Sequence, residues 1–161
     1  MQNIDLIAVG EMNAAYFAQG VAEYQKRLGG FCNFHIIELP EVQIADKNAS
    51  DRQIAKALQK EGEAILASVR RGAYLVALCV EGKQVSSEDL AAMIADRAMS
   101  GAGDMAFVIG SSHGLDDSVK RAAQARISLG RITLPHQLAR LVLTEQLYRA
   151  CTINAGMKYH K

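Results

Sequence analysis

Several features that would assign the chain to a class at once are absent. No apolar run approaches the roughly 20 residues that a membrane-spanning helix needs. The first residues from Met1 carry no basic leader, and their apolar stretch is too short for a secretory signal. Cysteine is scarce, and Cys32, Cys79 and Cys151 form no C-x-x-C pair, which argues against a disulfide framework and a zinc site. We therefore expect a cytoplasmic protein with no membrane segment, no metal, and reduced thiols that are mostly buried.

The common glycine-rich nucleotide motifs are also missing. The first apolar run turns at Val9-Gly10-Glu11, which does not match the G-x-G-x-x-G fingerprint of dinucleotide-binding proteins. No segment matches the phosphate-binding P-loop either. A Rossmann-type cofactor site is therefore disfavoured.

Acidic residues are nearly absent from the C-terminal part of the chain. Residues 1–117 contain 10 Lys and Arg against 16 Asp and Glu, whereas residues 118–161 contain 8 Lys and Arg against Glu145 alone. The formal net charge of the whole chain is only +1. This division indicates that the C-terminal part faces a polyanion or an acidic partner surface. The alternative is a solvated face without a partner.

The residues that are present indicate one globular α/β domain over residues 1–161. Half of the 161 residues are apolar and 22% are charged, which is ordinary for a chain that buries its own core. Apolar runs alternate with helical patterns, and the runs are apolar on both faces, as in a mostly parallel sheet covered by helices on both sides. The expected strands span residues 4–9, 34–39, 74–80, 105–109, 127–129 and 132–134. The expected helices span residues 13–28, 51–70, 88–99, 116–123 and 135–151, with Asp51 and either Ser86 or Ser87 as caps, and residues 40–50 form a mobile loop.

An open parallel sheet binds ligands beyond the carboxyl ends of its strands. This rule selects the turns after Val80, Ile109 and Leu129. The turn after Ile109 contains Gly110 and Gly114, which let the backbone approach a ligand, and its amides precede a helix. A plain strand-to-helix turn is the alternative.

The segment 128–136 is a second candidate. Two short apolar pieces flank Gly130 and Arg131, and a proline then starts a helix directly. Such a loop presents backbone N–H and C=O groups to a flat heterocycle such as adenine, with Leu129, Ile132 and Leu134 as apolar walls. The alternative is a strand with a kink.

The last helix and the tail carry the remaining candidate side chains. Glu145 lies in an otherwise apolar stripe with Leu138, Leu141, Val142 and Tyr148, four residues before Arg149, which favours a structural ion pair. Arg140 falls on the other face with His136 and Thr144, as a solvated charge or an RNA contact. The tail combines Tyr159, His160 and Lys161, and is either frayed, as most termini are, or catalytic.

Motifs along the whole length carry a resemblance to one known family. They are Leu6-Ile7-Ala8-Val9-Gly10, Ala22-Glu23-Tyr24, Lys26-Arg27, Lys60-Glu61-Gly62, Glu81-Gly82-Lys83, Val108-Ile109-Gly110, Gly114-Leu115, Thr133-Leu134-Pro135-His136, Glu145-Gln146-Leu147-Tyr148-Arg149-Ala150 and Tyr159-His160-Lys161. In their order and spacing the chain resembles the ribosomal large-subunit (23S rRNA) pseudouridine N3-methyltransferases, the YbeA-like family of the SPOUT superfamily.

The resemblance implies a C-terminal trefoil knot that holds S-adenosylmethionine, the methyl donor, in a bent shape. The cofactor contacts carried over by position are Leu78, Gly110, Leu129, Gly130, Arg131, Ile132, Thr133 and Leu134. It also implies a homodimer, and as substrate a pseudouridine in large-subunit rRNA within the assembled ribosome. Family members often show Gly-Pro-Glu where this chain has Ser111-Ser112-His113, so no role is carried over to those side chains.

Three residues are candidates for the chemistry that the resemblance implies. We expect Arg140 to stabilise the negative charge that develops on the base. His160 is a candidate base or positioning group, and Tyr159 a stacking group, both supplied to the other subunit's site. Two alternatives stay open: a knotted methyltransferase for another RNA nucleotide, and a non-catalytic ribosome- or RNA-binding factor.

Overall fold

The computed structural model describes residues 1–45 and 47–161, and within them five strands form one parallel sheet. The elements are β1 Asn3–Val9, α1 Ala15–Leu28, β2 Asn33–Leu39, α2 Asp51–Ser68, β3 Tyr74–Gln84, α3 Ser87–Met99, β4 Met105–Ile109, α4 Asp117–Ala122, β5 Ala125–Ser128 and α5 His136–Asn154. The strand order is β2-β1-β4-β3-β5, and each pair of neighbours is parallel. The expected α/β fold is therefore confirmed.

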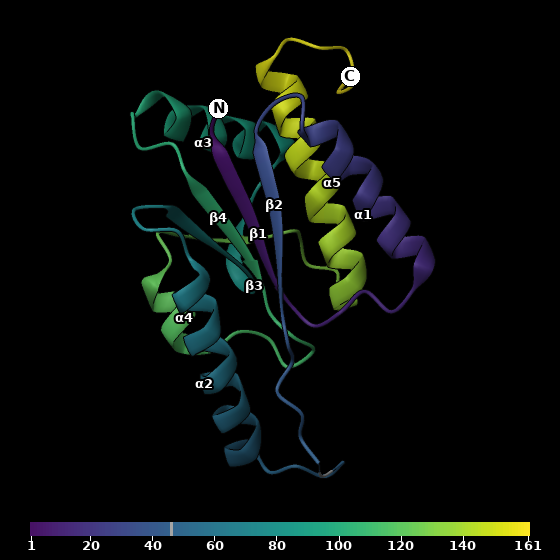
Figure 1. Cartoon of the computed structure of the whole chain (residues 1–161), viewed down its shortest axis with the longest axis vertical. Helices are drawn as coiled ribbons and strands as arrows, with labels where there is room; N and C mark the ends of the chain where they lie inside the picture. Colours follow the sequence, from purple (N-terminus) through teal and green to yellow (C-terminus); the bar gives the residue numbers. More distant parts are fainter. Residues whose placement is uncertain (46) are drawn as a thin grey trace.

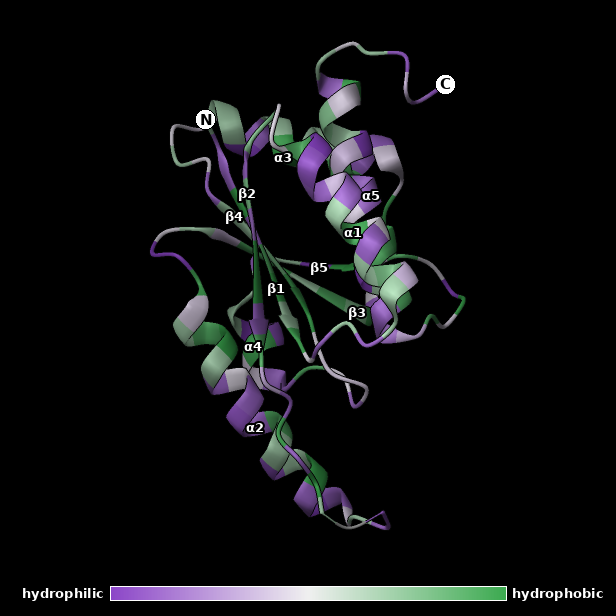
Figure 2. Ribbon diagram, turned by 45° about the vertical axis from the view of Figure 1, so that its right-hand side comes forward, coloured by the Kyte–Doolittle hydropathy of each residue, from purple (hydrophilic) through white to green (hydrophobic). Residues whose placement is uncertain are grey.

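Helices cover both faces of the sheet, as Figure 1 shows. Successive side chains of a strand point to opposite faces. In β4, Met105, Phe107 and Ile109 therefore join the core beneath α1, α3 and α5, while Ala106 and Val108 join the core beneath α2 and α4. The strands are accordingly the most hydrophobic part of the molecule in Figure 2, and the helices alternate between hydrophobic and hydrophilic residues.

Side-chain caps start α2, α3 and α4, with one correction to the sequence prediction. α2 is capped by Ser50 and not by Asp51. The Ser50 hydroxyl accepts from the Gln53 N–H at 3.2 Å, and the Gln53 side chain accepts from the Ser50 N–H at 2.8 Å, so two backbone N–H groups of the first turn are satisfied. Asp51 is the first helical residue. α3 begins in the same way at Ser86.

The largest departure from the predicted strands lies at β3 and β5. β3 continues to Gln84, and its pairing with β5 shifts register between Leu78 and Lys83, so residues 79–82 bulge out of the ladder. At Gly82 an added Cβ would lie 2.5 Å from the backbone carbon of Ile127, so only glycine fits this close approach.

The predicted strand over residues 132–134 is wrong. β5 ends at Ser128, and residues 129–135 form an irregular loop that leads into α5. Ile132 is 84% exposed.

The described residues between Pro40 and Ser50 lie outside helices and strands, as predicted, and the predicted loop includes residue 46, which is outside the described residues. None of the described helices is long and apolar enough to cross a membrane.

Candidate functional site

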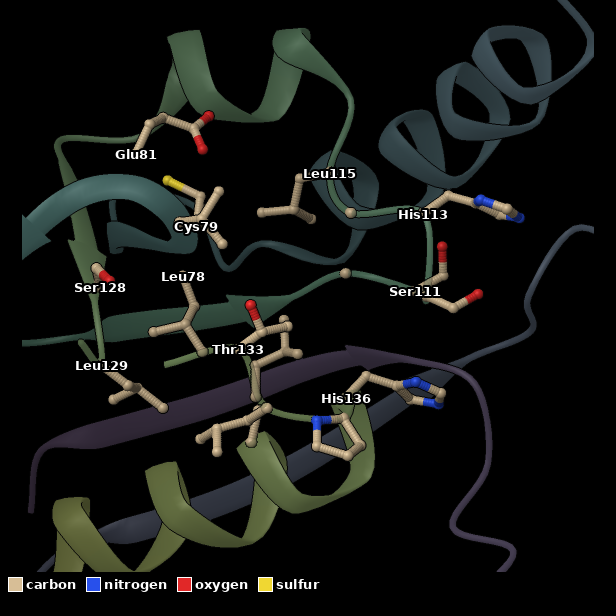
Figure 3. Close-up of a pocket in the computed structure, with 18 of the residues that line it drawn as sticks. Leu78, Cys79, Glu81, Ser111, His113, Leu115, Ser128, Leu129, Thr133 and His136 are labelled. Carbon is tan, nitrogen blue, oxygen red and sulfur yellow. The ribbon is translucent and has the colours of Figure 1, made fainter. Parts of the chain in front are cut away.

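A pocket of about 750 Å³ opens at the carboxyl ends of β3, β4 and β5, beside the start of α5 (Figure 3). Its walls come from residues 78–81 after the regular part of β3, residues 109–115 after β4, and residues 128–130 and 132–136 together with Ala139 and Lys120. This volume falls in the range of pockets that enclose small-molecule ligands. The three turns that the sheet rule selected therefore meet at one place.

The turn after β4 brings bare backbone to the pocket. At Gly110 an added Cβ would overlap the carbonyl group of Gly114, and Gly114 itself has a φ of +93°. The Gly114 N–H donates to the Ser111 carbonyl oxygen at 2.9 Å and closes the turn. Because both positions exclude a side chain, main-chain atoms form this wall.

The loop after β5 forms the facing wall. The Ser128 hydroxyl accepts from the Gly130 N–H at 3.2 Å and donates to the Gly130 carbonyl at 3.0 Å, and Gly130 has a φ of +133°. The loop turns sharply at this glycine and presents apolar side chains from Leu129, Ile132 and Leu134 to the pocket. A kinked strand, the alternative interpretation, is not observed here.

Most of the residues expected to contact the cofactor line this pocket together. They are Leu78, Gly110, Leu129, Gly130, Ile132, Thr133 and Leu134. Arg131 does not line it and is exposed to solvent. The lining is mostly apolar with a few polar groups, which is the composition typical of a site for a small organic ligand.

An ion pair on the pocket rim was not anticipated from the sequence. Lys120 Nζ lies 2.5 Å from Glu81 Oε1. The hydrogen bond from Lys120 lowers the pKa of Glu81, and the same bond raises the pKa of Lys120. Beside them, burial raises the pKa of the Cys79 thiol, with the nearby Glu81 charge adding to the effect. No sequence signal joins residues 81 and 120, because the bulge in β3 brings them together.

In the Ser111-Ser112-His113 segment, Ser111 has a structural role. The buried Ser111 hydroxyl donates to Glu61 Oε1 at 2.9 Å, and Glu61 Oε2 accepts from the Val42 N–H at 2.9 Å. The turn after β4 is thereby tied to α2 and to the segment after β2. His113 and His136 both lie at the pocket, as Figure 3 shows.

The predicted surface position of Arg140 is wrong. Its side chain is 2% exposed, and its guanidinium donates to Glu38 Oε2 at 2.5 Å and to the Gly10 carbonyl at 2.9 Å. It lines a second cavity, of about 550 Å³, with residues of α1, β2 and the segment after β1. Among the described atoms its Nε has no hydrogen-bond partner.

Arg140 was misplaced because the buried stripe of α5 is not the one predicted. The buried positions are Ala139, Arg140, Leu143, Thr144, Leu147, Tyr148, Ala150, Cys151 and Thr152. Leu138, Leu141, Val142 and Glu145 are only half-buried.

The C-terminal tail is docked onto α5 and is not frayed. The Tyr159 hydroxyl donates to Glu145 Oε1 at 3.0 Å, and its ring packs edge-on against Tyr148 with centroids 4.8 Å apart. Glu145 also pairs with Arg149 at 2.7 Å, which confirms the predicted ion pair. His160 Nε2 lies 2.6 Å from a Glu88 carboxylate oxygen.

This docking keeps the tail away from the pocket of its own chain. The tail contacts α5 at Glu145, Tyr148 and Arg149, whereas the pocket touches α5 at His136 and Ala139. At 1.5 Å per residue, Ala139 and Arg149 are about 15 Å apart along the helix. The structure therefore does not bring Tyr159 or His160 together with the pocket within one chain.

The three thiols are free, with Cys32 and Cys151 buried and Cys79 half-buried, as expected. In the part of the chain that the structure describes, no three His, Cys, Asp or Glu side chains are grouped closely enough to hold a metal ion.

Comparison with known proteins gives a consistent result. A family model described as "Predicted SPOUT methyltransferase" matches residues 2–160. The chain is 48% identical over 159 residues to the "Ribosomal RNA large subunit methyltransferase H" of Ligilactobacillus salivarius and 49% identical to the protein of that name from Pediococcus pentosaceus. In both cases the match covers 99% of this chain and 99% of the other protein.

Solved structures share the fold at low sequence identity. A probable methyltransferase from Bordetella pertussis superposes with a TM-score of 0.56 at 16% identity, over 93% of this chain and 95% of the other. A probable methylase family protein from Haemophilus influenzae gives 0.52 at 15% identity, over 99% of this chain and 71% of the other. At this identity the likeness concerns the fold alone.

Proposed function

Because the chain belongs to the SPOUT methyltransferase family, we propose that it transfers the methyl group of S-adenosylmethionine to N3 of a pseudouridine in large-subunit rRNA. The observation that carries the proposal is the pocket at the ends of β3, β4 and β5, in a chain whose full-length relatives are named as large-subunit rRNA methyltransferases. The ribosome is the proposed setting, and the cytoplasm, where ribosomes are, is the proposed location.

The pocket suits an adenosyl ligand. The glycine turn after β4 leaves main-chain atoms uncovered, and the loop after β5 offers the N–H and C=O groups that adenine edges bond. Leu78, Leu129 and Leu134 would form apolar walls for the purine, and Gly110, Gly130, Ile132 and Thr133 would contact the ligand mainly through their backbone. The bound donor supplies a methyl group on a cationic sulfonium, which is already activated for displacement.

The chain then has to position the acceptor and assist removal of its proton. The N3–H of pseudouridine lies between two carbonyl groups, and its anion spreads charge over both oxygens. Preorganised donors stabilise such charge without reorganising. We assign this role to Arg140, whose guanidinium is fixed by Glu38 and by the Gly10 carbonyl.

The second cavity lies close enough to the first for this role. Glu38 and Ile109 both pair with Ala8, from opposite sides, so their backbones are about 10 Å apart at ordinary strand spacing. A base that enters from the side of Arg140 would therefore approach the donor in the pocket.

We propose that the protein works as a homodimer in which Tyr159 and His160 complete the partner's site. Support comes from the docked tail, which is held by hydrogen bonds and ring packing and yet is remote from its own pocket. Tyr159 would stack on the nucleotide, and His160 would position it or accept its proton.

We also propose that residues 1–161 form a single methyltransferase domain with a C-terminal trefoil knot. One five-stranded sheet spans the chain, and the family model matches almost all of it. The loop between β5 and α5 and the bulge in β3 line the same pocket, and we propose that this loop belongs to the knot.

The central test is methylation of ribosomes by the purified protein with labelled S-adenosylmethionine, followed by mass spectrometry of the rRNA. We expect one added methyl group, on N3 of a pseudouridine. A methyl group on another nucleotide would favour a different knotted methyltransferase. Failure to bind S-adenosylmethionine by calorimetry would favour a non-catalytic ribosome-binding factor.

A variant at Gly110 tests whether the methyl donor binds in the pocket. Gly110→Ala places a Cβ against the Gly114 carbonyl, so we expect binding of the methyl donor to weaken at least about tenfold. Gly30→Ala is the matched control, since its Cβ would meet the nearest atom, the Arg27 carbonyl oxygen, at an ordinary 3.7 Å. Equal affinity in the two variants would show that the ligand binds elsewhere.

A further inference from the structure

The charged groups around the pocket are distributed unequally along the sheet. At the β2–β1 end, Glu38 and Glu11 line the second cavity, and Glu41 accepts from the Ser112 hydroxyl at 3.3 Å. At the β3–β5 end the charge is mostly positive. The pocket lies between these two ends, because β4 and β3 are in the middle of the strand order.

The positive end includes two exposed arginines that we call the cationic rim: Arg121 of α4 and Arg126 of β5. Lys83, which pairs with Ile127, lies on the opposite face of the sheet and is not part of the rim. The Arg126 guanidinium donates to the Lys120 carbonyl at 3.0 Å, which places it beside Arg121 at the end of α4.

The rim is held next to the pocket and keeps its charge available. Within the described ranges, 1–45 and 47–161, neither rim arginine forms an ion pair. Glu81 is already paired with Lys120, a pocket residue. Glu81 acts on Arg126 only through its charge at longer range, and Asp117 acts on Lys120, so neither rim arginine is hydrogen-bonded to a described carboxylate.

We infer that the cationic rim binds the phosphate backbone of the RNA substrate on the β5 side of the pocket. The inference rests on the proposed function and adds the orientation of the RNA to it. Phosphates are attracted to unpaired arginines and repelled by the carboxylates of Glu11 and Glu41 at the β2–β1 end, where Glu38 is paired with Arg140. The backbone therefore runs along β5 and α4, and the target base points across the pocket toward Arg140.

An RNA partner fits the rim better than an acidic protein surface does. Arginine forks match phosphate oxygens, and two neighbouring arginines can contact successive phosphates of one backbone. The rim adjoins the pocket through Lys120, which lines the pocket and whose carbonyl accepts from Arg126, so a nucleotide inserted there carries its neighbouring phosphates past Arg126.

The test compares Arg121→Gln/Arg126→Gln with Arg52→Gln/Lys56→Gln, which removes two exposed cations from the distant start of α2. Ribosome methylation is measured at several salt concentrations. We expect the rim variant to raise the KM for ribosomes about tenfold, to keep kcat, and to lower the slope of log affinity against log salt by about 2. Arg121→Lys/Arg126→Lys keeps both charges and should retain most of the affinity.

Two further measurements separate the possible outcomes. Calorimetry with S-adenosylmethionine should give the same affinity in all variants, and binding of a pseudouridine-containing rRNA hairpin should weaken in the rim variant alone. If the rim variant matches the α2 control in KM and salt slope, the proposed RNA-binding role of the rim is wrong, and the proposed methyltransferase function is unaffected. If ribosome binding weakens but hairpin binding does not, the rim contacts ribosomal protein and the inference is wrong. Absence of methylation by the protein without substitutions would contradict the proposed function. Hairpin binding would still test whether the rim binds RNA.

Discussion

Cys79 differs from the other two thiols in where its side chain lies. Cys32 and Cys151 are 3% and 7% exposed in the core beneath α1 and α5, whereas Cys79 is half-buried and lines the pocket. A thiol reacts as its thiolate, and burial together with Glu81 raises the pKa of Cys79. Alkylation of the native protein should therefore occur at Cys79, slowly at neutral pH and faster as the pH rises toward the raised pKa.

This reactivity reports on the occupant of the pocket. With S-adenosylhomocysteine at 100 times its Kd, we expect labelling of Cys79 by a maleimide to slow at least about tenfold, because the ligand covers the thiol. Mass spectrometry of peptides measures the labelling, and Cys79→Ser should abolish it. Unchanged labelling at a saturating ligand concentration that calorimetry has verified would place the ligand outside this pocket.

At the scale of single elements, Ser50 and Asp51 at the start of α2 are both of residue types that commonly cap helices, but they have different roles. Ser50 accepts the Gln53 N–H, while Asp51 is already helical and acts only through its charge near the helix start. Loss of a serine cap costs about 1 kcal/mol, and a first-turn carboxylate contributes roughly 0.3 to 1 kcal/mol. We expect Ser50→Ala to lower the Tm by about 2 to 4 °C and Asp51→Ala by less. Calorimetric melting measures both, and a larger loss for Asp51→Ala would contradict the observed cap.

The strands were predictable where burial alone determines them. β4 consists of five consecutive apolar residues covered on both faces, and its predicted bounds match the structure. β3 was predicted too short, because its polar end pairs with β5 only after the bulge at residues 79–82. A bulge depends on contacts between strands distant in the chain, and local composition does not reveal it.

Part of the candidate site could likewise be predicted from the sequence, and part could not. The turns at Gly110 and Gly130 follow from the rule that parallel sheets bind ligands at their carboxyl ends. Arg140 was assigned to the surface because helical periodicity predicted a different buried stripe of α5, and its partner Glu38 lies 102 residues earlier in the chain. Pairing over that distance depends on how α5 packs on the sheet, which helical periodicity does not show.

At the scale of the whole molecule, the position of the tail makes the proposed dimer testable. Tyr159 and His160 are fixed near Arg149, about 15 Å along α5 from Ala139 at the pocket. If the tail acts on the partner's site, then each site combines Arg140 of one subunit with the tail of the other. Arg140→Ala and a chain lacking residues 159–161 should then both be inactive as homodimers.

Coexpression of these two variants gives opposite results for the two arrangements. Random pairing makes about half of the molecules heterodimers, as expected for a symmetric dimer. In each heterodimer, the truncated subunit keeps Arg140 and receives an intact tail from its partner, so one of its two sites is complete. Ribosome methylation should therefore recover to about a quarter of the unmodified rate, with subunit pairing verified by differently tagged chains. A tail that acts only on its own chain leaves every site defective, so activity at the level of the separate variants, despite verified heterodimers, would show that the site is built within one subunit.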